Sequence, residues 1–421
     1  MPVSSLRKTI DAMAHNALAA SRCLVDIPRA TVDDCLRAMA ALLDERKDAI
    51  VKANRKDLAL AGKKNLAGPM IERLTLSDKT FESMKRGLVE VAALTAPAGE
   101  PFDERVRPNG LVIYKMRVPI GVIAIIYESR PNVTVDAAAL CLKSRNSVIL
   151  RGGSEAFFTN KALAAFFSLA CERSGLPCRA VQLVPTTDRK AVDLLLRKDR
   201  EIDLVIPRGG EGLIRAVVEK SRIPVIKHYK GVCHVFVSRF ADIAKALAIA
   251  VNAKVQRPAV CNAMETLLLD AGLPDADKKA ILDALIGKGV TLIGDPAVRR
   301  LVKGVKPATE SDWYAEYLDL RLAVRVVNGV NEAIAHINKY GSRHTDAIVT
   351  ESQEEASLFL RLVDSSSVMH NASTRFSDGG EYGLGAEIGI STDKLHARGP
   401  MGLAELTTYK WIVKGNGQVR S

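Results

Sequence analysis

The N-terminal region carries apolar side chains at intervals of three and four residues, which is the spacing of an amphipathic helix. Three stretches show this pattern, Ala17–Cys23, Thr31–Asn54 and Phe81–Leu94. The second opens on a threonine with two aspartates close behind, the side chains expected at a capped helix start. Pro97, Pro101 and the Pro-Asn-Gly turn that follows them end this helical pattern.

Beyond that turn, strand-like runs replace the helical pattern. Leu111–Arg117 and Gly121–Tyr127 are rich in β-formers and predict either a hairpin or two consecutive strands. Short apolar runs then alternate with helical stretches, which is typical of a parallel sheet covered on both faces. The predicted strands are Ser147–Leu150, Ala180–Val184, Asp203–Ile206, Pro224–Ile226 and Val232–Val237, and the helices between them are Val135–Lys143, Glu155–Ser174, Arg189–Arg197 and Glu211–Lys220.

A second alternating set begins at Asp242 and predicts a second α/β domain. A Gly-rich loop, Gly379–Gly389, and a last strand, Thr407–Lys414, follow it. The helices of this set are Asp242–Ala253, Asp275–Ile286, Asn331–Asn338 and Glu354–Leu362, and its strands are Glu265–Leu269, Val290–Ile293, Leu322–Val327, Ala347–Thr350 and Ser366–His370.

Composition narrows the class of protein. The 421 residues are 48% hydrophobic and 26% charged, as in globular proteins of more than one domain. The longest strongly apolar stretch, near Gly121–Tyr127, is far too short to span a membrane, and the N-terminus lacks the apolar core of a signal peptide. Seven cysteines without a C-x-x-C pair argue against disulfides and zinc sites. We therefore expect a cytoplasmic protein with reduced thiols, no metal site and no membrane partner.

The charge balance indicates anionic ligands. The formal net charge is +12, but the cations are spread along the chain and aromatic residues make up only 5%. A nucleic-acid-binding protein would cluster its cations and offer aromatic stacking platforms. An anionic substrate and cofactor therefore explain the charge better than nucleic acid does.

Two Gly-rich turns lie where phosphates are commonly bound. Arg151-Gly152-Gly153-Ser154 and Arg208-Gly209-Gly210 each follow a predicted strand and open a helix. Backbone N–H groups and a helix N-terminus favour an anion there, and arginine suits phosphate. Either turn alone also fits an ordinary strand–helix connection, whereas the pair favours a dinucleotide. Neither has the G-x-G-x-x-G spacing of an ordinary dinucleotide fold.

Cys261 is the candidate nucleophile. It follows the end of a predicted helix before Pro258, with Lys254 and Arg257 near it in sequence. Nearby cations lower a thiol pKa and favour the reactive thiolate. A buried cysteine at a strand start fits this local sequence equally well.

Five longer motifs resemble the γ-glutamyl phosphate reductase family of the aldehyde dehydrogenase superfamily. The resemblance runs from about Asp11 to Arg420 and implies an aldehyde-dehydrogenase-like α/β fold, with two Rossmann-like parallel-sheet domains and a small β oligomerisation arm. We expect an NADP(H)-binding domain over 1–231, with a hairpin at 106–119 in the arm, a catalytic domain over 232–385, and a C-terminal return segment with an oligomerisation strand over 386–421. The motifs are Val118–Thr134, Ile206–Ile214, Gln256–Cys261, Glu381–Gly389 and Arg398–Leu403.

The resemblance implies a reaction. Cys261 would attack L-glutamyl 5-phosphate, expel phosphate and form a thioester, which NADPH reduces to L-glutamate 5-semialdehyde. This is the second step of proline biosynthesis from glutamate, and it implies a functional link to glutamate 5-kinase and a homo-oligomer. The oxyanion would be held by the Cys261 N–H and the Asn132 side chain. Asn132 also fits a turn residue after Pro131, and an alignment without a gap puts Glu128 in its place.

The resemblance also assigns ligand contacts. Arg151 and Ser154, with Gly152 and Gly153, would hold the adenosine ribose or its 2′-phosphate, which favours NADP(H) over NAD(H). Arg208, Gly209 and Gly210 would face the pyrophosphate, and Glu387 the nicotinamide ribose. Arg257 and Arg375 are candidates for the substrate carboxylate or phosphate.

One stretch bears on the direction of the reaction. Aldehyde-oxidising relatives have Glu-Leu-Gly-Gly-Lys, whose Glu activates water, whereas Lys227–His234 contains no carboxylate. This favours a reductase over a hydrolytic aldehyde dehydrogenase or a binding protein that has lost catalysis. His228 there is either an acid–base group or a structural histidine. Arg145 replaces a usual glycine, and we expect it to avoid positive φ.

Overall fold

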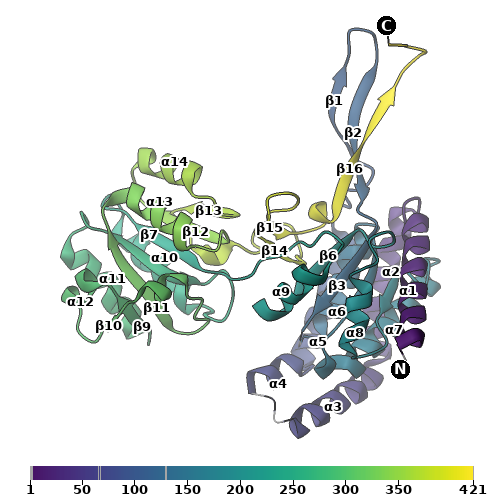
Figure 1. Ribbon diagram of the computed structural model, residues 1–421, viewed down its shortest axis with the longest axis horizontal. Coiled ribbons are helices and arrows are strands. Elements are labelled where there is room, and N and C mark those ends of the chain that lie inside the picture. The colour runs from purple at the N-terminus through teal and green to yellow at the C-terminus, as the bar shows by residue number, and fades with distance from the viewer. Residues whose placement is uncertain (1–2, 65, 67, 129, 421) are drawn as a thin grey trace. The chain divides into compact units, whose positions relative to one another are not determined.

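The computed structural model describes residues 3–64, 66, 68–128 and 130–420, and the chain folds as two compact units (Figure 1). The first unit comprises Met1–Lys227, Gly383–Gly389 and Met401–Ser421, and the second comprises His228–Tyr382 and Ile390–Pro400. The limits expected for the NADP(H)-binding domain, the catalytic domain and the C-terminal segment stay a prediction. No helix in the described ranges has both the length and the apolar character that a membrane crossing needs.

The first unit is built on a four-stranded parallel sheet of order β5-β4-β3-β6. All six residues of the central strand β3 are buried. Its alternate residues Val122, Ala124 and Ile126 pack against α1 and α8, while α6 contacts the sheet from the other side. The strands are β3 (Val122–Tyr127), β4 (Ser147–Arg151), β5 (Val181–Leu183) and β6 (Leu204–Arg208), and the helices between and after them are α6 (Asn132–Lys143), α7 (Phe157–Arg173), α8 (Arg189–Leu195) and α9 (Glu211–Lys220).

Helices precede this sheet, as predicted, but one predicted helix is divided. The stretch Thr31–Asn54 forms two helices because Arg46, at φ −116° and ψ 16°, leaves the helical conformation. Its backbone N–H still bonds to the carbonyl of Leu42 at 3.0 Å, so the first helix is closed before the second begins. The five helices are α1 (Val3–Leu24), α2 (Arg29–Glu45), α3 (Lys47–Lys63), α4 (Gly68–Leu74) and α5 (Asp78–Ala93).

A three-stranded antiparallel sheet extends beyond the rest of the first unit (Figure 1). It consists of β1 (Pro101–Val106), β2 (Val112–Pro119) and β16 (Thr407–Lys414), with β2 in the centre. The run Leu111–Arg117 therefore does not pair with Gly121–Tyr127, which supplies the central parallel strand instead. The predicted strand Pro224–Ile226 is also wrong, because only an isolated bridge joins Val225 to Val205.

Arg145 overturns the expectation about its backbone. It has φ +62°, the left-handed conformation that glycine adopts without strain. The conformation closes the end of α6, where the Arg145 N–H bonds to Leu142 O at 2.8 Å and the Asn146 N–H bonds to Cys141 O at 2.7 Å. The Arg145 guanidinium also donates to the carbonyl of Val25. These bonds hold arginine in a turn that costs about 1–2 kcal/mol for a side chain with a Cβ.

The second unit is built on a seven-stranded parallel sheet of order β10-β9-β11-β8-β7-β12-β13. Neighbouring residues of one strand enter different cores: Leu267 and Leu269 pack toward α10 and α11, whereas Leu268 packs toward α13 and α14. The strands are β7 (Cys233–Val237), β8 (Met264–Asp270), β9 (Thr291–Gly294), β10 (Lys306–Pro307), β11 (Arg321–Val327), β12 (Thr345–Val349) and β13 (Ser367–His370), and the helices are α10 (Ile243–Val255), α11 (Asp275–Gly287), α12 (Pro296–Leu301), α13 (Gly329–Tyr340) and α14 (Gln353–Leu362).

Short elements complete the chain. Two strands, β14 (Gly389–Ser391) and β15 (Gly399–Met401), pair with each other in the C-terminal part. The 3-10 helices of the described residues are η1 (Ser154–Ala156), η2 (Glu310–Tyr314), η3 (Thr374–Phe376) and η4 (Ala404–Leu406).

Candidate active site

The two Gly-rich turns lie at the carboxyl edge of the first unit's sheet. Arg151 ends β4, and Ser154 opens η1 before α7. Arg208 ends β6, and Gly210 caps the N-terminus of α9. The parallel strands β4 and β6, which lie on either side of β3, thus carry both turns to the same edge, which is where open α/β sheets bind ligands.

A cavity of about 490 Å³ opens beside these turns in the first unit. The first turn contributes Arg151, Gly153 and Ser154 to its lining. The helix α9, which follows the second turn, contributes Gly212 and Leu213. Gly152, Arg208, Gly209 and Gly210 are not among its lining residues. The structure therefore brings three of the predicted adenosine-side residues to one cavity, but not the predicted pyrophosphate-side residues.

Arg189 lines the same cavity, and sequence reasoning missed it. Burial lowers the pKa of the Arg151 guanidinium, and the like charge of Arg189 acts in the same direction, while Glu155 and Glu128 oppose it. Arg151 donates to Thr187 O at 3.2 Å, but its Nε is buried and finds no hydrogen-bond partner among the described residues. Two neighbouring guanidinium groups of this kind suit a phosphate. The position of Arg189 at the start of α8, beyond β5, was the available signal.

Glu128 occupies the second turn. Its carboxylate accepts from the Gly210 N–H at 3.0 Å, at the N-terminus of α9, where a phosphate was predicted to bind. A Cβ on Gly209 would lie 2.4 Å from Glu128 Oε2, so a larger residue there would force the Glu128 side chain to shift. An anion is thus favoured at this helix end, and a side chain of the protein already supplies one.

Asn132 and Glu387 lie in the first unit near Asp136. Asn132 begins α6, and its amide donates to Asp136 Oδ2 at 3.0 Å. Burial raises the Asp136 pKa to about 6, against the opposing effects of Asn132 and the charge of Arg208. Asp136 and Glu387 line a second cavity of about 180 Å³. The Asn132 side chain is therefore engaged by a carboxyl group of its own helix.

Cys261 lies in the second unit, between α10 and β8, and is partly exposed. Its loop is fixed on both sides: Cys233 Sγ contacts Cys261 O at 3.1 Å, and the Asn262 amide donates to Ser377 O at 2.8 Å. A Cβ on Gly231 would come within 1.9 Å of Cys261 O, so only glycine permits the segment before β7 to pack here. The thiol is not sealed in the hydrophobic core.

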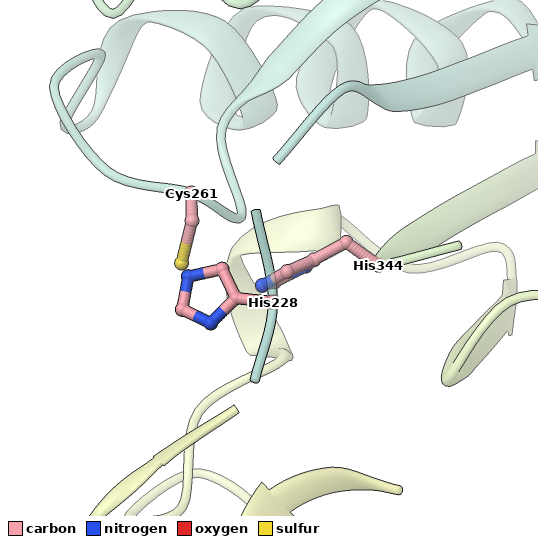
Figure 2. A group of neighbouring side chains, drawn as sticks. All are labelled: His228, Cys261 and His344. Carbon is pink, nitrogen blue, oxygen red and sulfur yellow. The ribbon is translucent and has the colours of Figure 1, made fainter. Parts of the chain in front are cut away.

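Two histidines flank the thiol. Ligand atoms of His228, Cys261 and His344 all lie within 4.8 Å of one another, and Figure 2 shows the thiol directed toward the His228 ring. The two imidazole rings pack edge to face, with centroids 5.6 Å apart. His344 is buried and its Nδ1 lies 2.9 Å from Thr345 Oγ1. Sequence reasoning missed His344, because it is far from Cys261 in the chain and only the fold brings it close.

The cations around Cys261 differ from those expected. Lys254 is buried in an ion pair with Glu265 at 2.6 Å, and burial raises the Glu265 pKa to about 7 against the effect of Lys254. Burial lowers the pKa of Arg375, whose charge interacts with those of Arg257 and Cys261. Arg375 Nε also donates to Gln256 Oε1 at 2.7 Å. Arg375 thus interacts electrostatically with the thiol, whereas Lys254 is neutralised by its buried partner.

Comparison with known proteins defines the class. The aldehyde dehydrogenase family profile matches residues 4–297, and the chain belongs to that family. It is 54% identical, over 99% of its length and 100% of the relative, to the gamma-glutamyl phosphate reductase of Desulfatibacillum aliphaticivorans. The crystal structure of gamma-glutamyl phosphate reductase from Thermotoga maritima superposes with a TM-score of 0.96 at 43% identity, covering 98% of this chain and 100% of that one. The predicted family and the aldehyde-dehydrogenase-like α/β fold are confirmed.

A more distant structure shares only the fold. An engineered glycolyl-CoA reductase with bound NADP⁺ has a TM-score of 0.69 at 17% identity, covering 96% of each chain. Proteins of this fold thus include one that holds a nicotinamide dinucleotide.

Proposed function

We propose that this protein reduces L-glutamyl 5-phosphate to L-glutamate 5-semialdehyde and phosphate with NADPH, through a thioester on Cys261. The observation that carries the proposal is a partly exposed thiol beside two imidazoles and two guanidinium groups in a family whose full-length relatives bear this enzyme's name. Imidazole accepts and returns a proton near neutral pH, and guanidinium groups hold a carboxylate or phosphate.

The cavity of the first unit is the proposed cofactor site. The buried Nε of Arg151, which has no partner among the described residues, gives this cavity a hydrogen-bond donor for an anionic ligand. Arg151, Arg189 and Ser154 would hold the 2′-phosphate, which favours NADPH over NADH. Gly152 and Gly153 let the backbone approach, and Arg208, Gly209, Gly210 and Glu387 remain the proposed contacts for the rest of the dinucleotide. Bound NADPH supplies the hydride that reduces the thioester carbon.

His228 begins the proposed sequence of proton movements. It accepts the Cys261 proton, and the thiolate attacks the acyl carbon. The carbon–sulfur bond forms first and leaves negative charge on the acyl oxygen. The carbon–oxygen bond to phosphate then breaks, the phosphate takes a proton from solvent, and Arg257 and Arg375 stabilise the departing dianion. The Cys261 N–H, and Asn132 as first proposed, hold the oxyanion. After reduction the carbon–sulfur bond breaks, and His228 returns the proton to sulfur.

The missing carboxylate helps the thioester to survive. The stretch that matches the water-activating motif of aldehyde-oxidising relatives, Lys227–His234, contains no carboxylate. A hydrolytic base would release glutamate and waste the acyl group. This difference therefore supports reduction as the productive direction.

The three-stranded sheet of β1, β2 and β16, which we take as the arm, supports assembly into a homo-oligomer. Its strand β16 exposes Tyr409, Trp411 and Val413, and Phe102 of β1 is exposed beside Tyr409. Exposed apolar patches of this kind favour contact with another protein surface. We place the enzyme in the cytoplasm, in the second step of proline biosynthesis, where a labile acyl phosphate from glutamate 5-kinase is consumed.

The reverse reaction tests the proposal. Glutamate 5-semialdehyde and NADP⁺ should give NADPH only when inorganic phosphate is present, because phosphate must release the acyl group from Cys261. The measurement is NADPH absorbance with phosphate and with a non-nucleophilic buffer of equal ionic strength. Turnover without phosphate, with glutamate as product, would overturn the proposal in favour of a hydrolytic aldehyde dehydrogenase.

A further inference from the structure

The His228–Cys261–His344 cluster combines one sulfur and two imidazole ligands in a single place (Figure 2). The three ligand atoms lie within 4.8 Å of one another, His344 is buried, and the other two residues are partly exposed. The sequence predicted no metal site because its seven cysteines include no C-x-x-C pair. The three residues meet only because the segments that precede β7, β8 and β12 converge in the second unit.

The surrounding packing holds these three segments. The Val232 N–H donates to Ser342 Oγ at 2.8 Å, which ties the segment after His228 to the one before His344. The close contact of Gly231 with the Cys261 carbonyl ties the first segment to the cysteine loop. The cluster is therefore assembled by main-chain packing, and a ligand does not have to organise it. Preorganisation of this kind lowers the cost of binding.

The donor set favours soft and borderline cations. Zinc binds cysteine sulfur at about 2.3 Å and histidine nitrogen at about 2.0–2.1 Å in a tetrahedron, which places ligand atoms roughly 3.3–3.6 Å apart. The cluster meets this spacing after side-chain shifts of about 1 Å. Two imidazoles and a thiolate discriminate against Mg²⁺ and Ca²⁺, which require oxygen ligands. Three protein ligands also leave the fourth position open.

We propose that His228, Cys261 and His344 bind one soft or borderline divalent cation, such as Zn²⁺, Co²⁺ or Cd²⁺, and that this cation blocks the thiol reversibly. On binding, the Sγ–H bond breaks, the proton passes to the buffer and a sulfur–metal bond forms without any change in oxidation state. The binding depends only on the geometry of the cluster. The inhibition also rests on the proposed role of Cys261 as nucleophile.

The neighbouring arginines allow a test in which cation binding and substrate binding should change in opposite directions. The charge of Arg375 interacts with that of Cys261, and Arg257 lies close enough to Arg375 to lower its pKa after burial has done so. These guanidinium groups favour an anionic substrate but repel a cation. Arg375→Met should therefore strengthen cation binding while it weakens binding of an anionic substrate. If Arg375→Met only damaged the active site in general, the variant would bind both the cation and the anionic substrate more weakly.

Cobalt titration of the full chain, freed of metal by a chelator, is the direct test. We expect one Co²⁺ per chain with a thiolate-to-metal charge-transfer absorbance, lost in Cys261→Ser. His228→Gln and His344→Gln should each weaken binding by more than the roughly 10–100-fold that loss of an outer-shell partner costs. Cys178→Ser, which removes an exposed thiol elsewhere, is the matched control and should leave the titration unchanged.

The outcomes separate binding from function. Zinc should abolish turnover, and a chelator should restore it. If Co²⁺ shows no thiolate band, or binds Cys261→Ser as tightly as the parent protein, the proposed site is wrong. If the band appears but turnover persists with Zn²⁺ bound, the site stands and the nucleophilic role of Cys261 falls. Circular dichroism of each variant confirms that a lost signal does not reflect lost folding.

Discussion

The two units present their functional groups in different ways. In the first unit, Arg151 and Ser154 are neighbours in sequence, and a strand followed by a glycine turn places them together. In the second unit, His228, Cys261 and His344 come from three distant segments. A phosphate site needs mainly backbone N–H groups and one local turn, whereas a nucleophile needs side chains brought from several directions. The first kind of site is visible in sequence, and the second depends on tertiary structure.

The Cys261→Ala variant should show the largest difference between the two units, because it should remove turnover and leave NADPH binding intact. Without the nucleophile, kcat should fall by at least about 10⁴-fold, because the thioester route disappears. NADPH binding, measured by fluorescence titration, should change little, since the cofactor cavity belongs to the first unit. Cys178→Ala, an exposed thiol, serves as control. Retained turnover would refute the nucleophilic role.

His228→Gln should have the next largest effect. Loss of an acid–base group lowers kcat by roughly 10²–10⁴-fold, and the pH–rate profile should lose the limb that the imidazole supplies. A histidine with only a structural role would lower stability and leave the shape of the profile intact. His396→Gln, on an exposed loop, is the matched control and should keep the parent profile.

Arg151→Met and Arg189→Met test the first unit alone. Each should raise the Kd for NADPH by roughly 10–100-fold, because a hydrogen bond to a charged group is worth about 1.5–3 kcal/mol. The Kd for NADH should hardly change, which separates the 2′-phosphate from the rest of the cofactor. Lys220→Met changes a cation of the same cavity that is already paired with Asp193 at 2.8 Å, and it should have little effect. Equal losses for both cofactors would contradict the assignment.

Asp136→Asn should have the smallest effect, on stability. Burial raises the Asp136 pKa to about 6 from 3.8, so the folded state favours the protonated form. The stability that this preference contributes is complete below pH 3.8 and is lost as the pH rises through 6. The variant should therefore gain up to about 3 kcal/mol over the parent at pH 7, and the gain should shrink toward pH 4. Urea unfolding at both pH values measures it, and a gain independent of pH would exclude Asp136 as its source.

The sequence predicted most of the framework because buried parallel strands are nearly all apolar. Thr407–Lys414 matches β16 residue for residue, and β3 lies within one residue of its predicted run. By contrast β1, Pro-Phe-Asp-Glu-Arg-Val, is exposed along its whole length and shows no alternation, so it escaped prediction. The break at Arg46 was not predicted either, since arginine is a good helix former.

For the candidate site, local residues were predictable and distant ones were not. Cys261 and Arg151 stand in recognisable motifs. His344 reaches its site only through folding, and no spacing relative to Cys261 reveals it. Arg189 also reaches its cavity through folding, and its place at the start of α8 was the one available signal. Lys254 shows the reverse error, because its proximity in sequence suggested an effect on Cys261 that its buried partner Glu265 largely cancels.

The pairing of β2 with β16 has a consequence for how the molecule is made. During translation β2 leaves the ribosome before the entire second unit has been synthesised, and β16 leaves after it. Until then one edge of β2 has unsatisfied backbone groups that can recruit strands from other nascent chains. The second unit, almost continuous in the chain, can fold during that interval. Completion of the arm is therefore a late event, and truncation before β16 should yield aggregates rather than a smaller enzyme.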